Sequence, residues 1–346
     1  MRKLSLMFCL IVAICMMLAA CQTATPAATE VEEPAVATEA PVVATEVPAE
    51  PAFDASKVKL IYVGVSAVAP YQKTNKAGIA DEAAKLGITD IKYVDPPNDN
   101  DLETQMQLMD AAILEKPDAI LLVPVDSAAI GPTVQKAKDA GIKVVAIGIN
   151  SVQVPPDAFV ATDSVNTSYK AGETMCTALG GKGKVLVVLG NPIHAPTQLR
   201  EEGFMNALKE KCPDIEVVGR QVANWKPEEA QTVVINTLNA HPDLAGVYTE
   251  NDTMGQGAMA ALQQLNNTTV KLITYDCMQV MVEAVRDGKS FADVCQMPFY
   301  EGQKAVDAAV SLVKGEKVEP IIDAGTFVVL KENAEQFLKD FAGMLP

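Results

Sequence analysis

The sequence predicts an α/β protein of two related lobes, each built on a parallel sheet, with a ligand cleft between them. Short apolar runs alternate with stretches of helical periodicity, a pattern typical of βαβ units. The chain carries this pattern twice, because KPDAILLVPVDS, from Lys116, and HPDLAGVYTEND, from His241, align without a gap. An Ala-Pro pair also precedes Gly78 in the first copy and Gly203 in the second. Self-similarity over about a hundred residues exceeds any solenoid repeat and indicates two α/β lobes.

The second copy indicates where a ligand would bind. Residues 244–248 predict an apolar strand and 249–253 a polar turn, ahead of a helix rich in Ala and Met. Asp252 fits the helix N-cap, which leaves Asn251 at the carboxyl end of a parallel strand, where open α/β sheets bind ligands. Taken alone, Asn251 fits a turn residue equally well. The alignment of the two copies favours the ligand site, because it places Asp126 opposite Asn251.

The first twenty residues predict a lipoprotein signal peptide. Two basic residues precede an uncharged run, 4–20, that ends in small residues, and this order describes a secretory signal. The sequence LAAC, ending at Cys21, resembles the bacterial lipobox, whose cysteine becomes the lipidated first residue of the mature chain. A retained membrane helix is the weaker alternative, because about 17 uncharged residues lie at the short limit for a span.

Residues 21–56 predict a disordered acidic tether. They are mainly Ala, Thr, Glu, Pro and Val, which cannot bury a core, and the prolines keep the chain extended. The formal net charge of −16 argues against nucleic acid as a partner, because nucleic-acid-binding proteins are basic. About 290 residues remain after the tether, which suits two domains better than one.

The elements of the first lobe are expected to alternate between strand and helix. Residues 66–75 are expected to form a loop before the first helix. FVATD, at 159–163, is short and ends in polar residues, so it suits a crossing between the lobes. The expected strands are 59–65, 91–94, 119–123 and 144–147, and the expected helices are one ending near 86–87 and those at 102–115 and 130–140.

The second lobe repeats this order and contains a sequence that tests an enzymatic alternative. GQGAMA, from Gly255, matches the dinucleotide-binding fingerprint, but that fingerprint needs its first glycine at the strand-to-helix turn. Asn251 and Asp252 occupy the turn here, so we reject an NAD enzyme. No nucleophile triad or paired-carboxylate motif predicts another enzyme, and no cofactor is expected. The expected elements are strands at 185–189, 215–218, 244–248, 272–275 and 291–295, a helix at 301–314 and a strand at 327–330.

Several motifs together resemble the ribose-type sugar-binding proteins of ABC importers, a group of type I periplasmic binding proteins. They are VGVSAVAPYQKTNKAGIADEAAKLG, KPDAILLVPVDS, HPDLAGVYTENDTMGQGAMAAL, LITYD and VCQMPFYEGQKA, and the similarity covers about 57–330. The resemblance implies two doubly wound lobes joined by three hinge strands. It also implies the lobe boundaries, 57–162 plus 297–325 for the first lobe and 163–296 plus 326–346 for the second.

Carried over position by position, the resemblance implies second-lobe ligand contacts at Trp225, Asn251, Asp276 and Gln296. Amide side chains offer donors and acceptors, and an ionised carboxylate accepts two hydroxyl protons. An aromatic face covers the apolar C–H side of a sugar ring. Core packing is the alternative for Trp225 and a helix cap is the alternative for Asp276. Glu301 is expected to lie outside the cleft.

The first-lobe contacts match the family less closely. Ser66 and Tyr71 match a polar and an aromatic contact, and Gln72 replaces a second aromatic residue. Asn150 follows a Gly-Ile pair where the ribose binders have Asp-Arg, and Gln198 stands at the position of a further ligand arginine, two residues before an arginine of this chain. The loss of two guanidinium groups argues against ribose itself, and a cleft rich in amides suits a neutral polyhydroxy compound.

Four cysteines remain after the signal peptide and its cleavage site. An exported chain permits disulfides, and four cysteines allow three pairings. Cys176 and Cys212 lie at the ends of successive helices, whereas Cys277 and Cys295 each adjoin a proposed ligand residue at a strand end. We therefore predict the disulfides Cys176–Cys212 and Cys277–Cys295, with four buried free thiols as the alternative. No Cys-x-x-Cys motif or histidine cluster predicts a metal site.

Together these observations predict a lipid-anchored extracytoplasmic solute-binding protein at the outer face of the bacterial cytoplasmic membrane. It is expected to be a monomer that captures a sugar or similar neutral solute by hinge closure and delivers it to an ABC importer permease. A ligand sensor of the same fold, signalling to a membrane receptor, and a non-sugar ligand such as a nucleoside are the alternatives. A sugar-responsive repressor would need a basic helix-turn-helix where this chain has a signal peptide and tether.

Overall fold

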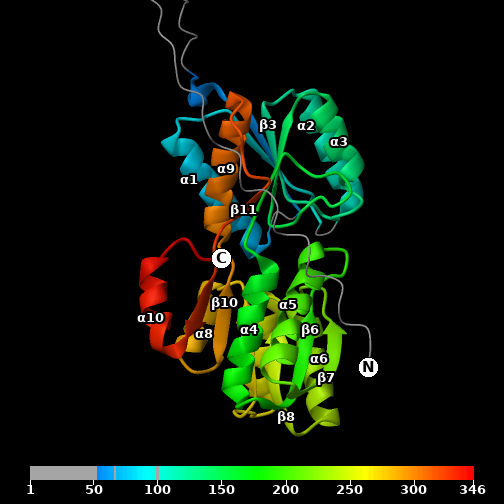
Figure 1. Cartoon of the computed structure of the whole chain (residues 1–346), viewed down its shortest axis with the longest axis vertical. Coiled ribbons are helices and arrows are strands. Elements are labelled where there is room, and N and C mark those ends of the chain that lie inside the picture. Colours follow the sequence, from blue (N-terminus) through cyan, green and yellow to red (C-terminus); the bar gives the residue numbers. More distant parts are fainter. Residues whose placement is uncertain (1–52, 66–67, 99–100) are drawn as a thin grey trace, which may run out of the picture. The chain divides into compact units, whose positions relative to one another are not determined.

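The computed structural model describes residues 53–65, 68–98 and 101–346, which form two α/β lobes, each with a six-stranded sheet (Figure 1). The first sheet has the strand order β11-β5-β4-β3-β1-β2, and its neighbouring strands are parallel. The strands are short and almost wholly apolar, as expected for a sheet covered on both faces. They are β1 (Leu60–Val63), β2 (Ile91–Val94), β3 (Ala119–Leu122), β4 (Lys143–Ile147), β5 (Ala158–Ala161) and β11 (Ile321–Asp323).

The second sheet repeats the topology of the first, in the order β12-β10-β9-β8-β6-β7. Its edge strand β12 is antiparallel to β10, whereas the other neighbouring pairs are parallel. Numbered within its lobe and read from the other edge, each sheet runs 2-1-3-4-5-6, a doubly wound order, which confirms the predicted fold class. The strands are β6 (Lys182–Leu189), β7 (Asp214–Val222), β8 (Leu244–Thr249), β9 (Lys271–Tyr275), β10 (Ala292–Cys295) and β12 (Phe327–Leu330).

Helices cover both faces of the first sheet, with α1 and α9 on one face and α2 and α3 on the other (Figure 1). Successive residues of a strand point to opposite faces, so Leu60 packs with the α1 and α9 side chains, while Ile61 packs with those of α2 and α3. The sheet is therefore buried on both sides. The helices are α1 (Pro70–Lys85), α2 (Leu102–Leu114), α3 (Gly131–Asp139) and α9 (Pro298–Lys314).

The second sheet is covered in the same way. Leu186 packs with the α6 and α7 side chains on one face, and Val187 packs with those of α4 and α5 on the other. A smaller cluster around Phe337 joins α8 and α10 to β12. The helices are α4 (Ser164–Leu179), α5 (Ala195–Lys211), α6 (Pro227–Ala240), α7 (Asp252–Gln264), α8 (Gln279–Arg286) and α10 (Lys331–Asp340), and a short 3-10 helix, η1 (Ala55–Lys57), precedes β1.

The paired glycines of the two sequence copies have the same structural role. A Cβ at Gly78 of α1 would lie 1.9 Å from the carbonyl oxygen of Phe299 in α9, and one at Gly203 of α5 would lie 2.1 Å from that of Val165 in α4. Each glycine thus lets the helix after the first strand of its sheet, α1 or α5, cross closely over the helix that follows an interlobe crossing. The sequence duplication therefore preserves a helix–helix contact as well as a strand pattern.

The structure departs from the sequence expectations in three places. Helix α1 begins at Pro70, inside the stretch expected to be a loop, because proline fits the first helical turn, where its missing N–H costs nothing. The short strand β11 and the helix α10 were not predicted, since their exposed residues carry a weak apolar pattern. Within the described ranges, no helix combines the length and apolar character that a membrane span requires.

Two disulfides cross-link the second lobe, and they are the same two pairs that the sequence analysis favours. Cys176 of α4 is joined to Cys212, which follows α5, with 5.7 Å between their Cα atoms. Cys277, just after β9, is joined to Cys295, the last residue of β10, with 4.8 Å between their Cα atoms. The first bridge ties two helices together, and the second ties two adjacent strand ends at the edge where a doubly wound sheet binds ligands.

Candidate functional site

Three chain crossings join the lobes, from β5 to α4, from β10 to α9 and from β11 to β12. Thr162 lies in the first crossing, and its Oγ1 contacts the other two. This oxygen accepts the Met297 N–H at 3.3 Å and lies 3.1 Å from both the Gly325 carbonyl oxygen and Glu301 Oε1, either of which can take its proton. A single hydroxyl group therefore links all three crossings.

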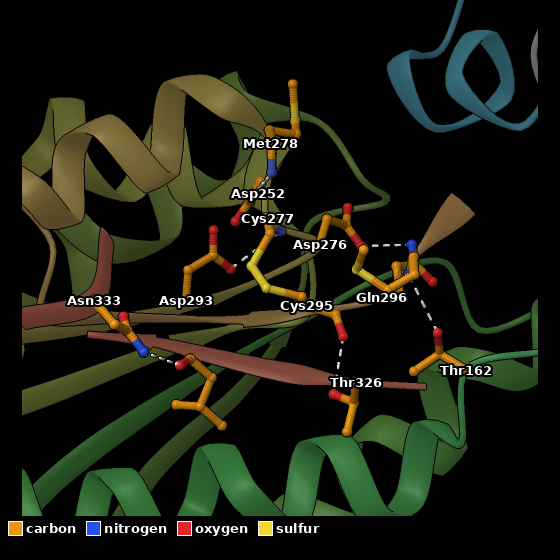
Figure 2. The surroundings of a disulfide bond; sticks show 12 residues. Thr162, Asp252, Asp276, Cys277, Met278, Asp293, Cys295, Gln296, Thr326 and Asn333 are labelled. Atoms are coloured by element: carbon orange, nitrogen blue, oxygen red, sulfur yellow. Dashed lines mark hydrogen bonds between the residues drawn. A yellow bond between two sulfur atoms is a disulfide. The ribbon is translucent and has the colours of Figure 1, made fainter. Parts of the chain in front are cut away.

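Beside the crossings, Arg200, Gln296 and Asp276 form a buried hydrogen-bonded cluster, which we call the guanidinium cluster. Arg200 Nη2 donates to Gln296 Oε1 at 3.0 Å, and Gln296 Nε2 donates to Asp276 Oδ1 at 2.7 Å (Figure 2). Arg200 Nη1 lies 3.5 Å from Asp276 Oδ1 and also donates to the carbonyl oxygen of Glu250. Asp276 and Gln296 directly follow β9 and β10, so the cluster lies at the carboxyl ends of parallel strands, where doubly wound sheets bind ligands.

Aromatic rings surround this guanidinium group. Arg200 Cζ lies 3.8 Å from the ring centroid of Tyr275 and 5.7 Å from that of Trp225, both within the range of cation–π attraction. The Trp225 ring lies against Gly190, where an added Cβ would come within 1.9 Å of it. Trp225 Nε1 donates to His194 Nδ1 at 2.8 Å. The tryptophan is half-buried beside the cluster, which combines a polar and an apolar surface as sugar sites require.

Burial raises the pKa of several carboxyl groups here. The pKa of Asp276 rises to about 7, because its burial outweighs the opposing effect of the Arg200 charge. The pKa of Glu250, whose Oε2 accepts the Gly190 N–H at 2.8 Å, rises to about 8 for the same reason. Burial lowers the pKa of His194 to about 4, so it is neutral at physiological pH. The site therefore has one permanent cation and several carboxyl groups, which disfavours an anionic ligand.

The structure corrects the predicted roles of Asn251 and Asp252. Asn251 is itself the N-cap of α7, and its Oδ1 accepts the Met254 N–H at 2.9 Å. Asp252, expected to be the cap, is fully buried, and its Oδ2 accepts the Met278 N–H at 2.6 Å. The sequence alone does not distinguish Asn251 from Asp252 as the N-cap, because both side chains are good caps. The residue at which the strand ends decides which of them precedes the helix.

The first-lobe candidates are only partly brought together. The Tyr71 hydroxyl reaches Glu301 and lies against Gly148, where an added Cβ would be 2.0 Å away. Asn150 has a buried Oδ1 without a hydrogen-bond partner in the described part of the chain. Gln72 is buried and accepts the hydroxyl proton of Tyr62 inside the lobe. Ser66 and the lipidation candidate Cys21 lie outside the described residues.

The arginine that the family pattern led us to expect at Gln198 is present two residues later. Gln198 is exposed, and its Nε2 donates to the Pro192 carbonyl oxygen at 2.6 Å, so it does not join the guanidinium cluster. Arg200 does, with its side chain 7% exposed. A two-residue shift along α5 moves a side chain around the helix by about 200°, so the structure, rather than the alignment, identifies Arg200. The one sequence signal for Arg200 would have been a charged residue at a position of α5 that is predicted to be buried.

Glu301, which was expected to lie outside the cleft and to matter little, has several buried partners. Glu301 is completely buried in the first turn of α9, next to the crossings. Its Oε1 accepts the Thr162 N–H at 3.0 Å, and its Oε2 accepts the Tyr71 hydroxyl proton. Burial raises its pKa. The residue therefore links a proposed ligand residue to the hinge, a role that depends on the packing of α9 against α1.

We expect Glu301→Ala to destabilise the protein by about 2–4 kcal/mol, because it leaves buried groups of Tyr71 and Thr162 without partners. Glu301→Gln should recover most of this loss, since its amide oxygen can accept the Thr162 N–H and its amide nitrogen can donate to Tyr71. Urea denaturation measures both changes in unfolding free energy. Glu319→Ala, at an exposed position, is the control. Equal stability of the Ala and Gln variants would contradict this assignment.

A surface groove of about 1110 Å³ lies away from these residues. Lys271, Phe291 and Val328 help to line it, together with residues of α4 and α7. Lys271 is the first residue of β9, and Phe291 directly precedes β10, so the groove lies at the amino ends of the strands. None of the predicted ligand residues lines it, and doubly wound sheets bind ligands at the opposite edge.

The two doubly wound lobes, with a buried polar cluster at the strand ends beside the crossings, define the class of two-lobed solute-binding proteins. Residues 61–317 match the family described as periplasmic binding protein domain. The chain belongs to this family.

Relatives with described functions support the same assignment. The ribose import binding protein RbsB of Bacillus subtilis is 32% identical over 74% of this chain and 81% of its own. The xylitol-binding protein of Mycolicibacterium smegmatis is 32% identical over 76% of this chain and 75% of its own. A solved periplasmic solute-binding protein from Actinobacillus succinogenes, with bound D-allose, has a TM-score of 0.76 at 26% identity and covers 81% of this chain and 100% of its own. All three are named as binding proteins, and the first and third are named for import or for an ABC transporter.

Proposed function

We propose that this chain is a lipid-anchored extracytoplasmic protein that captures a sugar or similar neutral polyhydroxy solute and delivers it to an ABC importer permease. The observation that carries the proposal is the guanidinium cluster, in which a cation, an amide and a carboxyl group meet beside an aromatic ring. These groups can donate to and accept from several hydroxyl groups at once. The ligands named for the relatives, ribose, xylitol and D-allose, are neutral polyhydroxy compounds.

The proposed binding cycle uses the two lobes as rigid bodies that close on the ligand. The lobe boundaries proposed are 57–162 plus 297–325 and 163–296 plus 326–346, with the crossings as hinge. The Ala195 N–H donates to Ser127 Oγ at 3.0 Å, which supplies a direct contact between the lobes away from the crossings. A ligand that converts a rarely closed protein into a mostly closed one must prefer the closed state by about 5 kcal/mol.

A thermal-shift screen tests the ligand class. The compounds are D-ribose, D-allose, D-arabinose, xylitol and adenosine, with ribose 5-phosphate as an anionic comparison. We expect at least one neutral compound to raise the melting temperature by several degrees, because a ligand at a hundred times its Kd adds about 2.7 kcal/mol of stability. Stabilisation by the phosphate alone would overturn the proposal of a neutral ligand. Stabilisation by adenosine alone would identify the ligand as a nucleoside and not as a sugar.

The proposed anchor makes a separate prediction about Cys21. The lipobox-like sequence and the acidic stretch that follows it support this proposal. Two or three acyl chains hold a protein on a membrane far more firmly than one, so wild-type protein should sediment with membranes and Cys21→Ala should not. Fractionation with mass spectrometry of the mature amino terminus measures this. Membrane retention of Cys21→Ala, with no lipid on the wild-type protein, would contradict the anchor.

A further inference from the structure

The turn that carries Asp276 has a backbone conformation that its residues rarely adopt. Asp276 has a φ of 131° and Cys277 a φ of 60°, and neither is glycine. Two successive residues in the positive-φ region persist only when surrounding contacts hold them, and such strain is concentrated at ligand sites. The surroundings of residues 276–278 should therefore contain the groups that hold the Asp276 side chain in place.

Three restraints act on this turn, and Figure 2 shows them together. Cys277 is joined to Cys295 by a disulfide. The Cys277 N–H donates to Asp293 Oδ1 at 3.3 Å, and the Met278 N–H donates to Asp252 Oδ2 at 2.6 Å. The restraints come from two different elements, since Cys295 and Asp293 lie on β10 and Asp252 begins α7. Each of them acts on one of the two residues that directly follow Asp276.

The two carboxyl groups that hold the turn also contact each other. Asp252 and Asp293 are both completely buried. Asp252 Oδ1 and Asp293 Oδ2, the oxygens that the backbone N–H groups do not use, accept no hydrogen bond in the described part of the chain. Burial, together with the contact with Asp293, raises the pKa of Asp252 well above its ordinary value, and burial raises that of Asp293 to about 7. The pair is therefore expected to hold a proton near neutral pH, because two buried carboxyl groups in contact do not readily both ionise.

The disulfide links the backbones of two guanidinium-cluster residues. Cys277 directly follows Asp276, and Cys295 directly precedes Gln296. The side chains of Asp276 and Gln296 meet in the 2.7 Å hydrogen bond described above. A covalent bridge one residue away on each strand keeps this pair in register. The other disulfide, Cys176–Cys212, joins α4 to the end of α5, and neither cysteine adjoins Asp276 or Gln296 in the sequence.

We propose that the Cys277–Cys295 disulfide and the Asp252–Asp293 pair form a positioning unit that holds Asp276 in its ligand-binding orientation. The proposal rests on the proposed function, because it assigns a ligand role to Asp276. None of the four residues is required to touch the ligand. The unit acts through the 276–278 turn, so its loss weakens binding more than it changes the fold.

The test compares one polypeptide in two redox forms. Cys176→Ala/Cys212→Ala leaves Cys277–Cys295 as the only bridge, and Cys277→Ala/Cys295→Ala leaves only the other. Each is refolded with and without reductant and titrated by calorimetry with the best-binding compound among D-ribose, D-allose, D-arabinose and xylitol. We expect reduction to weaken binding at least tenfold in the first variant and less than twofold in the second. Equal affinity of the oxidised and reduced first variant would overturn the proposal.

A second comparison tests the carboxyl pair without opening the disulfide. Asp293→Asn keeps an acceptor for the Cys277 N–H and an N–H donor for Asp252, as the shared proton does, whereas Asp293→Ala keeps neither. We expect the Asn variant to bind within threefold of wild type and the Ala variant at least tenfold more weakly. Equal weakening by both substitutions would overturn the positioning role. This comparison also tests the positioning role if the reduced Cys176→Ala/Cys212→Ala variant does not fold.

Hydrogen exchange separates this proposal from the proposed function. The amides of Cys277 and Met278 should exchange at least tenfold faster in Asp293→Ala than in wild type, with or without sugar. If no compound binds the wild-type protein, the proposed function fails. If, in addition, the amides of Cys277 and Met278 exchange equally fast in Asp293→Ala and wild type, the positioning unit is overturned as well. Faster exchange in that case would support the held turn independently of the ligand.

Discussion

Arg200→Met is expected to lower the free energy of unfolding by about 3–5 kcal/mol, because it removes one partner of a buried charged group. Arg200 supplies donors to Gln296 Oε1 and to the Glu250 carbonyl oxygen and lies 3.5 Å from the Asp276 carboxylate. Methionine fills a similar length of the cavity but offers no donor, so these acceptors become unsatisfied. The affinity for the ligand should fall at least tenfold, since Asp276 and Gln296 lose the group that orients them.

Arg220→Met is the matched control for this variant. Arg220 also bonds a glutamate, Glu201, but its side chain is 55% exposed, and exposed ion pairs contribute at most about 1 kcal/mol. Urea denaturation gives the stability of both variants, and calorimetry gives their affinity for the compound found in the screen. Wild-type stability and affinity in Arg200→Met would show that the guanidinium cluster is not the site.

Asp276→Ala should weaken ligand binding by about 1.5–3 kcal/mol, which corresponds to roughly 10- to 150-fold, because ligand hydroxyl groups lose a charged acceptor. The affinity of the wild-type protein should also fall as the pH is lowered from 8 to 6. The pKa of Asp276 is raised to about 7 in the unliganded protein, so its carboxyl group takes up a proton over this interval and can accept fewer hydroxyl protons. Calorimetry across this pH range measures the effect.

Asp276→Asn is the control that isolates this titration from the neighbouring acids. Glu250 and Asp293 also have raised pKa values, of about 8 and about 7, but they remain in the Asn variant, which should show a flatter pH profile. The stability of the unliganded protein should change in the opposite direction. A carboxyl group whose pKa is higher in the folded than in the unfolded state stabilises the fold when protonated, so stability should fall as the pH rises towards 7. A steep affinity profile retained by Asp276→Asn would assign the titration to another group.

The two predictions concern residues, Asp276 and Arg200, that differ in how readily they can be located from the sequence. Asp276 follows the strand motif LITYD, and the resemblance to the ribose-type binding proteins implied its role as a ligand contact. Arg200 was passed over because the family pattern pointed to Gln198. Strand ends can be located from an apolar run and its polar boundary, whereas the face of a helix that points inward depends on how the helix is rotated. The residues at strand ends were therefore the easier ones to find.

The architecture of this protein follows from patterns that are visible in its amino-acid sequence. Alternation of apolar strands with helices, and the alignment of two copies of that pattern, are enough to predict two doubly wound lobes, because strand and helix periodicities are local properties of the chain. The positions of the cysteines at helix and strand ends led to the same pairs that the structure contains.

The contacts between polar groups, in contrast, depend on how distant parts of the chain pack together. Glu301 and Thr162 are 139 residues apart, and their contact exists because α9 returns from the second lobe to pack on the first. Asp252 and Asp293 lie on different elements and share one buried space, although each alone resembles an ordinary surface carboxylate. The energy of such contacts depends on burial and on the partner's position, neither of which is a property of neighbouring residues in the chain.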